Sequence, residues 1–419
     1  MKGLLAALLI VSAAAPTYAQ TTDLVELAKT GTPQSIRAAI KQGADLKTAD
    51  ERGMTALMSA AASNQNPEVI AVLLKAGADI DAVSKDGLTA LMFAAAHTQN
   101  PDVITALLKG GANLQAESAT RMTALMFAAN GNRNPEIIKV LLMAGADIAA
   151  RDKGGRTTLM WAAGNQNPDV VTVLLKAGAN VGAESTDGWT SLTFAAFFNR
   201  NPDVITRLLK AGADITVEDK DGVTALMIAA SNNQNPEVIA TLLRAGADVS
   251  AGDNVGKTAL MHAAINNQNP EVVIPLLRSG ADIEAESKDG WTSLTYAAFA
   301  NQNPKMIEAL LKAGADLNAA DKYGMTVLIY AAANNQSTEV IDTLLKAGAD
   351  IRAENMIGQT ALMMAAKKNQ NSEVIRTLLK AGADGKAKSK EGKTAFDYVK
   401  NNNTLKDTDA YWRLEEASR

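Results

Sequence analysis

A short motif, glycine, any residue, then threonine, returns along this 419-residue chain at a nearly fixed spacing. The step is 34 residues throughout, apart from one step of 33 between Gly155 and Gly188. The glycines are Gly53, Gly87, Gly155, Gly188, Gly222, Gly256, Gly290, Gly324, Gly358 and Gly392, and Arg121 takes the glycine's place in one further copy. A fixed period in this range indicates a stacked array, in which each unit buries its apolar side against its neighbours.

Residues 222–255 illustrate how one unit should fold. Thr224 is a good N-cap for a short first helix made of strong helix formers. After a polar turn, Asn235 caps a second helix with Pro236 at its first position, where the missing N–H costs nothing. Apolar residues share one face of this helix, and Gly246 ends it in a left-handed conformation. A short extended segment should then lead to a tight turn at the next motif glycine.

This pattern resembles the ankyrin repeat. The consensus Thr-Pro-Leu-His-x-Ala-Ala reads Thr-Ala-Leu-Met-x-Ala-Ala at residues 89–95, and Leu-Leu-x-x-Gly-Ala-Asp is present at residues 73–79. Two departures recur: methionine replaces the histidine, and the turn between helices is usually Asn-x-Asn-Pro with one extra residue. The resemblance implies an all-α repeat solenoid of helix-turn-helix units with short β-hairpin connections, elongated and curved, in a distinct subfamily.

The resemblance also divides the chain into a capped array. Residues 20–52 are expected to form an N-terminal capping repeat, and residues 392–419 a C-terminal one. Between them lie ten repeats, at 53–86, 87–120, 121–154, 155–187, 188–221, 222–255, 256–289, 290–323, 324–357 and 358–391. The outer face of a capping repeat is exposed to water and must therefore be polar. The residues expected to do so are Lys29, Gln34, Arg37 and Lys41 at one end, and Lys400, Asn401, Asn402, Asn403, Lys406, Asp407 and Arg413 at the other.

Residues 1–19 have the pattern of a secretory signal peptide. Lys2 precedes an apolar core over residues 3–15, and small residues ending at Ala19 predict cleavage before Gln20. The core is shorter than the roughly 20 residues that span a bilayer, and an uncleaved N-terminal anchor is the alternative. Because no later apolar run is long enough, we expect no membrane insertion after cleavage. The chain has no cysteine, which fits an exported bacterial protein that is periplasmic or secreted.

The residue inventory argues against an enzyme. With 45 acidic and 41 basic residues the net charge is −4, so wholesale nucleic-acid binding is not expected. Without cysteine there is no thiol nucleophile or iron–sulfur centre. The two histidines, His97 and His262, lie five units apart and cannot share a metal or a proton. No phosphate loop or nucleophile elbow is present, so we expect no catalysis, no metal and no cofactor.

Methionine fills one position of most first helices. The members are Met58, Met92, Met126, Met160, Met227, Met261 and Met363, with Thr193, Thr295 and Ile329 in the remaining places. A sulfur stripe is compatible with copper handling or oxidant scavenging. The alternative, which the position favours, is flexible filler between helices.

Asparagine recurs in two rows around the inter-helix turn. The first row is Asn64, Asn132, Asn199, Asn233, Asn267, Asn301, Asn335 and Asn369. The second row is Asn66, Asn100, Asn134, Asn201, Asn235, Asn269, Asn303 and Asn371. Such rows suit a glycan- or ion-binding ladder, but helix capping and satisfaction of turn backbone groups are favoured.

Aromatic residues are only 4% of the chain, so their positions are informative. Six share the slot four residues after the capping threonine: Phe93, Phe127, Trp161, Phe194, Tyr296 and Tyr330. By the family analogy this slot faces the stack interior, and we expect these six to be core residues.

Two units carry a second set of aromatics in less usual places. Trp189 and Trp291 follow the turn glycine inside the identical sequence Gly-Trp-Thr-Ser-Leu-Thr. Phe197, Phe198 and Phe299 lie at the exit of the first helix in the same two units. In ankyrin-like arrays these slots face the concave groove that holds proteins, so all five are candidate partner-binding residues. The alternative is a duplicated three-unit block with packing aromatics and no partner.

The sequence therefore predicts an exported, non-enzymatic and monomeric ankyrin-repeat scaffold that binds a protein through its concave groove. A glycan or surface polymer bound through the Asn-rich loops is the alternative function. Pro275 falls inside a second helix and should loosen the unit at 256–289.

Overall fold

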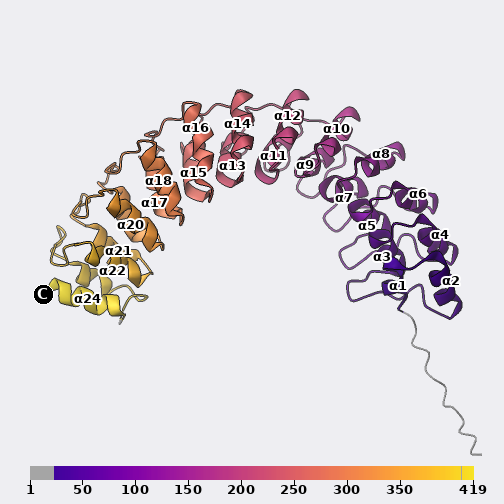
Figure 1. The fold of residues 1–419 in the computed structure, drawn as a ribbon, viewed down its shortest axis with the longest axis horizontal. Helices are drawn as coiled ribbons and strands as arrows, with labels where there is room; N and C mark the ends of the chain where they lie inside the picture. The colour runs from indigo at the N-terminus through magenta and orange to yellow at the C-terminus, as the bar shows by residue number, and fades with distance from the viewer. Residues whose placement is uncertain (1–22, 407) are drawn as a thin grey trace, which may run out of the picture. The chain divides into compact units, whose positions relative to one another are not determined.

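The computed structural model describes residues 23–406 and 408–419, which form 24 α-helices and one 3₁₀ helix (Figure 1). The signal peptide predicted over residues 1–19 and the cap residue Asp407 lie outside the described residues. The chain divides into two compact units, one ending at residue 119 and the other beginning at residue 120.

The first unit contains three helix pairs, each closed by a short polar turn. The pairs are α1 (Leu24–Thr30) with α2 (Pro33–Lys41), α3 (Ala56–Ser63) with α4 (Pro67–Lys75), and α5 (Ala90–His97) with α6 (Pro101–Lys109). First helices pack on first helices and second helices on second helices, which gives two parallel rows.

The second unit continues this arrangement over nine further pairs. Its first helices are α7 (Ala124–Gly131), α9 (Thr158–Ala163), α11 (Ser191–Phe198), α13 (Ala225–Asn232), α15 (Ala259–Asn266), α17 (Ser293–Ala300), α19 (Val327–Asn334), α21 (Ala361–Lys368) and α23 (Ala395–Val399). Its second helices are α8 (Pro135–Met143), α10 (Pro168–Lys176), α12 (Pro202–Lys210), α14 (Pro236–Arg244), α16 (Val273–Arg278), α18 (Pro304–Lys312), α20 (Thr338–Lys346), α22 (Ser372–Lys380) and α24 (Asp409–Ser418). Within each row, packing runs from neighbour to neighbour, as a repeat solenoid requires.

The helices form where the repeating motif predicts them. In α13, the side chain of Thr224 accepts a hydrogen bond from the N–H of Met227, and in α14 Asn235 caps the N–H of Glu237. The second helix of the 256–289 unit differs, because Pro275 has no N–H to donate. That helix opens as a 3₁₀ turn, η1 (Pro270–Val272), and continues directly as α16, so the proline changes the first turn of the helix without ending it.

The core is a layer of apolar side chains between the two rows. None of the seven methionines in the first-helix column is more than 1% exposed, so these residues are core filler and not an accessible sulfur stripe. The prediction of packing methionines is therefore confirmed.

The connections between pairs are tight reversals with isolated antiparallel bridges, such as the one from Glu218 to Thr224. Gly222 needs to be glycine for two reasons: its φ is +76°, and a Cβ would lie 2.9 Å from the backbone nitrogen of Asn254. Neighbouring reversals are bonded to one another, since the Asn254 N–H donates to the Asp221 carbonyl at 2.9 Å.

The first asparagine row is a buried ladder that links consecutive pairs. In the second unit, the amide nitrogen of Asn267 donates to the carbonyls of Ala230 at 2.8 Å and Asn233 at 2.9 Å, both in the preceding repeat. Its amide oxygen accepts the N–H of Asn269 at 2.9 Å. The row therefore satisfies turn backbone groups, as predicted, and does so between repeats as well as within them.

The ladder also includes Asn165 and Asn402, which bond the preceding repeats in the same way. Asn402 is only 9% exposed, so its assignment to the polar face of the C-terminal cap is wrong. The predicted cap residues Lys400, Asn401, Asn403, Lys406 and Arg413 are exposed.

No helix in the described part of the chain is both long enough and apolar enough to cross a membrane. Among the same residues, no group of three or more histidine, aspartate or glutamate side chains is placed to hold a metal ion.

Candidate functional site

Nine aromatic residues of the second unit gather into two clusters, apart from a third group, Phe396, Tyr411 and Trp412, at its C-terminal end. The Trp189 cluster consists of Trp161, Trp189, Phe194, Phe197 and Phe198. The Trp291 cluster consists of Trp291, Tyr296, Phe299 and Tyr330. Each cluster joins first helices to the base of the reversals, α9 and α11 in one case and α17 and α19 in the other.

In the Trp189 cluster the indole is held from two sides. Its ring centroid lies 5.3 Å from that of Phe194 and 5.6 Å from that of Phe197. Its Nε1 donates to the Oδ2 of Asp219, in the next reversal, at 3.3 Å. Phe198 completes the group, 4.5 Å from Phe197, and is 53% exposed. The cluster therefore presents a large apolar side chain to solvent on a fixed base.

The Trp189 cluster lines a pocket of about 620 Å³. Its aromatic wall is Trp161, Trp189, Phe194 and Phe198, and its charged rim is Arg156, Asp187, Asp219, Lys220 and Asp221. An apolar wall with a few charged groups at the rim is the usual make-up of a binding pocket.

Two hydrogen-bond donors belong to residues that line this pocket, and the first of them is closed off from solvent. The indole nitrogen of Trp161 is buried and has no hydrogen-bond partner in the described structure. The guanidinium of Arg156 lies over the rings of Trp161 and Phe194, at 5.3 and 5.7 Å from their centroids. A ligand that fills the pocket can therefore offer an acceptor as well as an apolar group.

The Trp189 cluster lies beside the short repeat. Because the 155–187 unit lacks one turn residue, α9 has 6 residues where α11 has 8. Its C-cap, Gly164, lies beside Phe198, and a Cβ on that glycine would be 3.6 Å from the Phe198 Cβ. The end of the shortened helix therefore lies against Phe198.

The Trp291 cluster is closed by its own contacts. The Trp291 ring lies 4.4 Å from Tyr330, 5.0 Å from Tyr296 and 5.1 Å from Phe299. The Tyr296 hydroxyl donates to Ser287 Oγ at 3.1 Å, and the Tyr330 hydroxyl to Asp321 Oδ2 at 2.6 Å. Both tyrosines are buried.

Electrostatics agree with this closed arrangement. Burial, together with the hydrogen bond to Asp321, raises the pKa of Tyr330 well above its ordinary value, so the hydroxyl stays a donor. One repeat earlier, His262 stands in the slot that Trp161 occupies in the other cluster, and its Nε2 lies 3.0 Å from Asp253 Oδ2. Burial lowers the pKa of His262.

The five residues predicted to bind a partner are thus brought together in two groups, Trp189 with Phe197 and Phe198, and Trp291 with Phe299. Of these five, only Phe198 is exposed, and the others are half-buried against neighbouring rings. The six aromatics predicted as core are also reassigned in part. Phe194, Tyr296 and Tyr330 are buried but belong to the clusters, while Phe93, Phe127 and Trp161 are only half-buried.

The sequence reasoning missed Arg156, Trp161 and Asp219. A signal for the first was available, because Arg156 precedes its capping threonine just as Trp189 does. Asp219 had no such signal, since its bond to Trp189 joins residues 30 positions apart, in two successive reversals.

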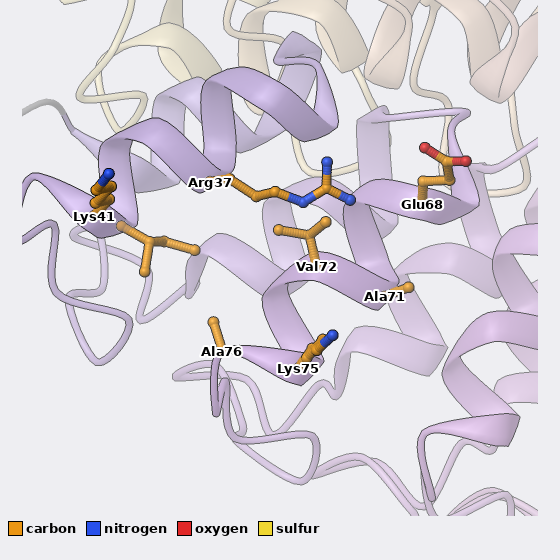
Figure 2. A pocket seen from close by; sticks show the side chains of 8 residues that line it. Arg37, Lys41, Glu68, Ala71, Val72, Lys75 and Ala76 are labelled. Atoms are coloured by element: carbon orange, nitrogen blue, oxygen red, sulfur yellow. The ribbon is translucent and has the colours of Figure 1, made fainter.

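A second pocket, of about 570 Å³, lies in the first unit between α2 and α4. Figure 2 shows Arg37 extending over Val72 towards Glu68, with Lys41 and Lys75 at other edges. Arg37 and Lys41 are among the predicted polar residues of the N-terminal cap. The pocket has no aromatic wall and no buried donor, and we regard it as a weaker candidate.

The fold and the repeating contacts define a helical repeat solenoid, and comparison with known families identifies which one. The family described as ankyrin repeats in three copies matches residues 24–118, 98–185, 125–219, 192–287 and 264–355, and ankyrin repeats in many copies match residues 344–399. The chain belongs to the ankyrin-repeat family. Ankyrin repeats generally mediate protein–protein interaction, and proteins built from them are typically non-enzymatic scaffolds. Comparison with curated proteins gives no match.

Proposed function

We propose that this protein is an exported scaffold that binds a protein partner on the side of its first helices and reversals, the concave groove of the family, with the Trp189 cluster as its anchor. The observation that carries the proposal is the aromatic pocket with Phe198 at its edge. A preformed pocket loses little conformational entropy on binding, and a partially exposed aromatic gains most from being covered.

The pocket favours a partner that inserts one apolar side chain and places a carbonyl or hydroxyl oxygen near it. The guanidinium of Arg156, in the pocket lining, would donate to that oxygen. The lining carries three acidic and two basic side chains, so a neutral oxygen is favoured over a carboxylate.

The alternative function, glycan or polymer binding through the Asn-rich loops, has fewer free groups to draw on. The first-row amides are bonded between repeats, as for Asn267. In the second row, Asn235 donates to the Arg200 carbonyl at 2.7 Å while its oxygen caps α14. We therefore retain protein binding as the proposed function.

Phe198 offers the cleanest test of this proposal. Phe198→Ala should weaken partner binding by about 2 kcal/mol, roughly thirtyfold, with an unchanged unfolding midpoint. The matched control is Trp412→Ala, which removes an aromatic of similar exposure, 55%, from α24. The wild type and the two variants are each used as bait for affinity capture from periplasmic extract. Mass spectrometry then quantifies the partner that each bait recovers. Equal recovery of the same partner by all three baits would reject the anchor.

We also propose that the protein acts in the periplasm or outside the cell, on the strength of Lys2, the apolar core over residues 3–15 and Ala19. Fractionation followed by mass analysis of the intact protein tests this. We expect a mature form that begins at Gln20, in the periplasm or medium. A full-length protein in the cytoplasm would contradict the proposal.

A further inference from the structure

A second surface lies at the C-terminal end of the second unit, where lysines replace the aromatics of the two clusters. Lys393 precedes its capping threonine, as Trp189 and Trp291 do, and Lys367 lies at the exit of α21, in the position of Phe197. The ammonium groups of Lys367 and Lys393 lie over the ring of Tyr398, at 5.4 and 5.9 Å from its centroid. The same slots that form aromatic walls elsewhere thus gather positive charge here.

Charge along the sequence is strongly uneven. Residues 361–406 contain ten basic and four acidic side chains, a net charge of +6, while the whole chain has a net charge of −4. The remaining residues therefore carry a net charge of −10. Much of the excess lies in the last reversal, whose sequence at 386–393 is Lys-Ala-Lys-Ser-Lys-Glu-Gly-Lys.

Most of these lysines are not neutralised from within the protein. Lys367, Lys388 and Lys390 are exposed and form no ion pair within the described residues. Lys393 does pair with Glu391, at 2.9 Å. The surface therefore offers several unpaired cations to a partner.

Exposed apolar side chains lie on the two reversals that precede the basic one. Tyr323 is 58% exposed, Met356 61% and Ile357 47%, at the tips of two successive reversals. The tips are bonded in order, because the Met356 N–H donates to the Tyr323 carbonyl at 2.9 Å and the Lys390 N–H to the Ile357 carbonyl at 3.0 Å. Apolar tips and basic tips thus form one continuous strip, over the reversals that precede α19, α21 and α23.

We propose that this strip binds an acidic polypeptide segment that carries apolar residues between its carboxylates. Complementary charge supplies steering and orientation, and the three apolar side chains at the tips supply surface to bury. A polypeptide fits better than a polyphosphate or a sulfated polymer, which would leave those tips uncovered. The free cations are lysines, without the arginine forks that suit phosphate. This surface is separate from the Trp189 pocket and goes beyond the function proposed above.

The test uses the full mature chain and a fluorescent peptide of about a dozen residues, mostly glutamate and aspartate with leucine and phenylalanine at intervals. The variant Lys367→Gln/Lys388→Gln/Lys390→Gln should bind this peptide at least about fivefold more weakly at moderate salt. The control Lys176→Gln/Lys210→Gln/Lys312→Gln removes the same charge from the ends of second helices and should bind as the wild type does.

A second variant tests the apolar part of the strip. Tyr323→Ser/Met356→Ser/Ile357→Ser should reduce binding of the mixed peptide to the level of plain polyglutamate, whose own binding should not change. These side chains are exposed, so the fold should persist, and circular dichroism checks this. Phe198→Ala should leave all of these affinities unchanged, which separates this proposal from the Trp189 pocket.

Three outcomes would overturn the proposal. The first is an equal loss of binding in the control lysine variant, which would mean that the peptide responds to net charge alone. The second is tighter binding of polyphosphate or heparin through the same three lysines, which would assign the strip to an anionic polymer. The third is an unchanged preference for the mixed peptide when the apolar tips are replaced.

Discussion

Trp189 and Trp291 lie in the same six-residue sequence and yet form two different kinds of site. Around Trp189 the next reversal contributes Asp219, a bond partner at the pocket's rim, and the preceding repeat contributes Trp161, Arg156 and the shortened helix α9. Around Trp291 the following repeat contributes Tyr330, whose ring covers the indole at 4.4 Å. The neighbours, and not the motif, decide whether a tryptophan lines a pocket or is covered by another ring.

The two tryptophans should differ most in what their removal costs in the free energy of unfolding. Trp291→Ala removes a ring that contacts three others and should cost about 4 kcal/mol, near the upper end for aromatic-to-alanine changes in a core. Trp189→Ala, with two ring contacts and an open side, should cost about half as much. Urea unfolding followed by circular dichroism measures both. Equal costs would remove the distinction between the clusters.

The hydroxyl of Tyr330 should show the next largest effect. Tyr330→Phe leaves Oδ2 of the half-buried Asp321 without its donor and should cost about 2 kcal/mol. The matched change Tyr296→Phe removes a bond to the neutral Ser287 and should cost only about 1 kcal/mol. Thermal unfolding of the two variants ranks them, and the reverse order would contradict the closed arrangement described here.

A substitution that makes the Trp189 cluster resemble the Trp291 cluster should raise the stability of the second unit. Ser185 lies nine residues before Phe194, the same separation that joins Ser287 to Tyr296 and Ser389 to Tyr398. Phe194→Tyr should therefore gain a hydroxyl bond and stabilise the second unit by about 1 kcal/mol. A measured destabilisation would show that the pocket has no room for the closed arrangement.

The smallest expected effect is on the way the free energy of unfolding depends on pH. Burial lowers the pKa of His262 below its ordinary 6.5, so the folded protein binds fewer protons than the unfolded chain as the pH drops below that value. The stability linked to His262 is thus complete above about pH 6.5 and declines on acidification. His262→Gln should flatten this part of the profile between pH 7 and pH 5, measured by urea midpoints. An unchanged slope would exclude the histidine as its cause.

Most of the fold could be predicted from sequence, because a repeat makes each local signal visible many times. Capping threonines, the Asn-Pro helix starts and the apolar faces recur unchanged, and the structure places helices where they predict them. The errors came from positions whose environment belongs to another repeat. From the sequence alone, Asn402 resembles a polar cap residue. In the structure its amide nitrogen donates to the carbonyls of Ala366 and Asn369 in the preceding repeat.

The candidate site was predictable only in part, for the same reason. The sequence identified Trp189, Phe197 and Phe198 by their unusual slots but treated Trp291 as equivalent. Asp219 and Tyr330 decide that question, and they lie 30 and 39 residues away from the tryptophans they contact. Separations of that size become contacts only when the repeats are stacked.

Site-specific photo-cross-linking in the exported protein tests the central claim most directly. A photoreactive phenylalanine analogue is placed at Phe198 in one variant and at Phe299 in the other, and the cells are irradiated. The account predicts a discrete partner adduct at Phe198, lost when Trp189 is replaced by alanine, and none at Phe299. The same adduct from both positions, or from Phe299 alone, would contradict it.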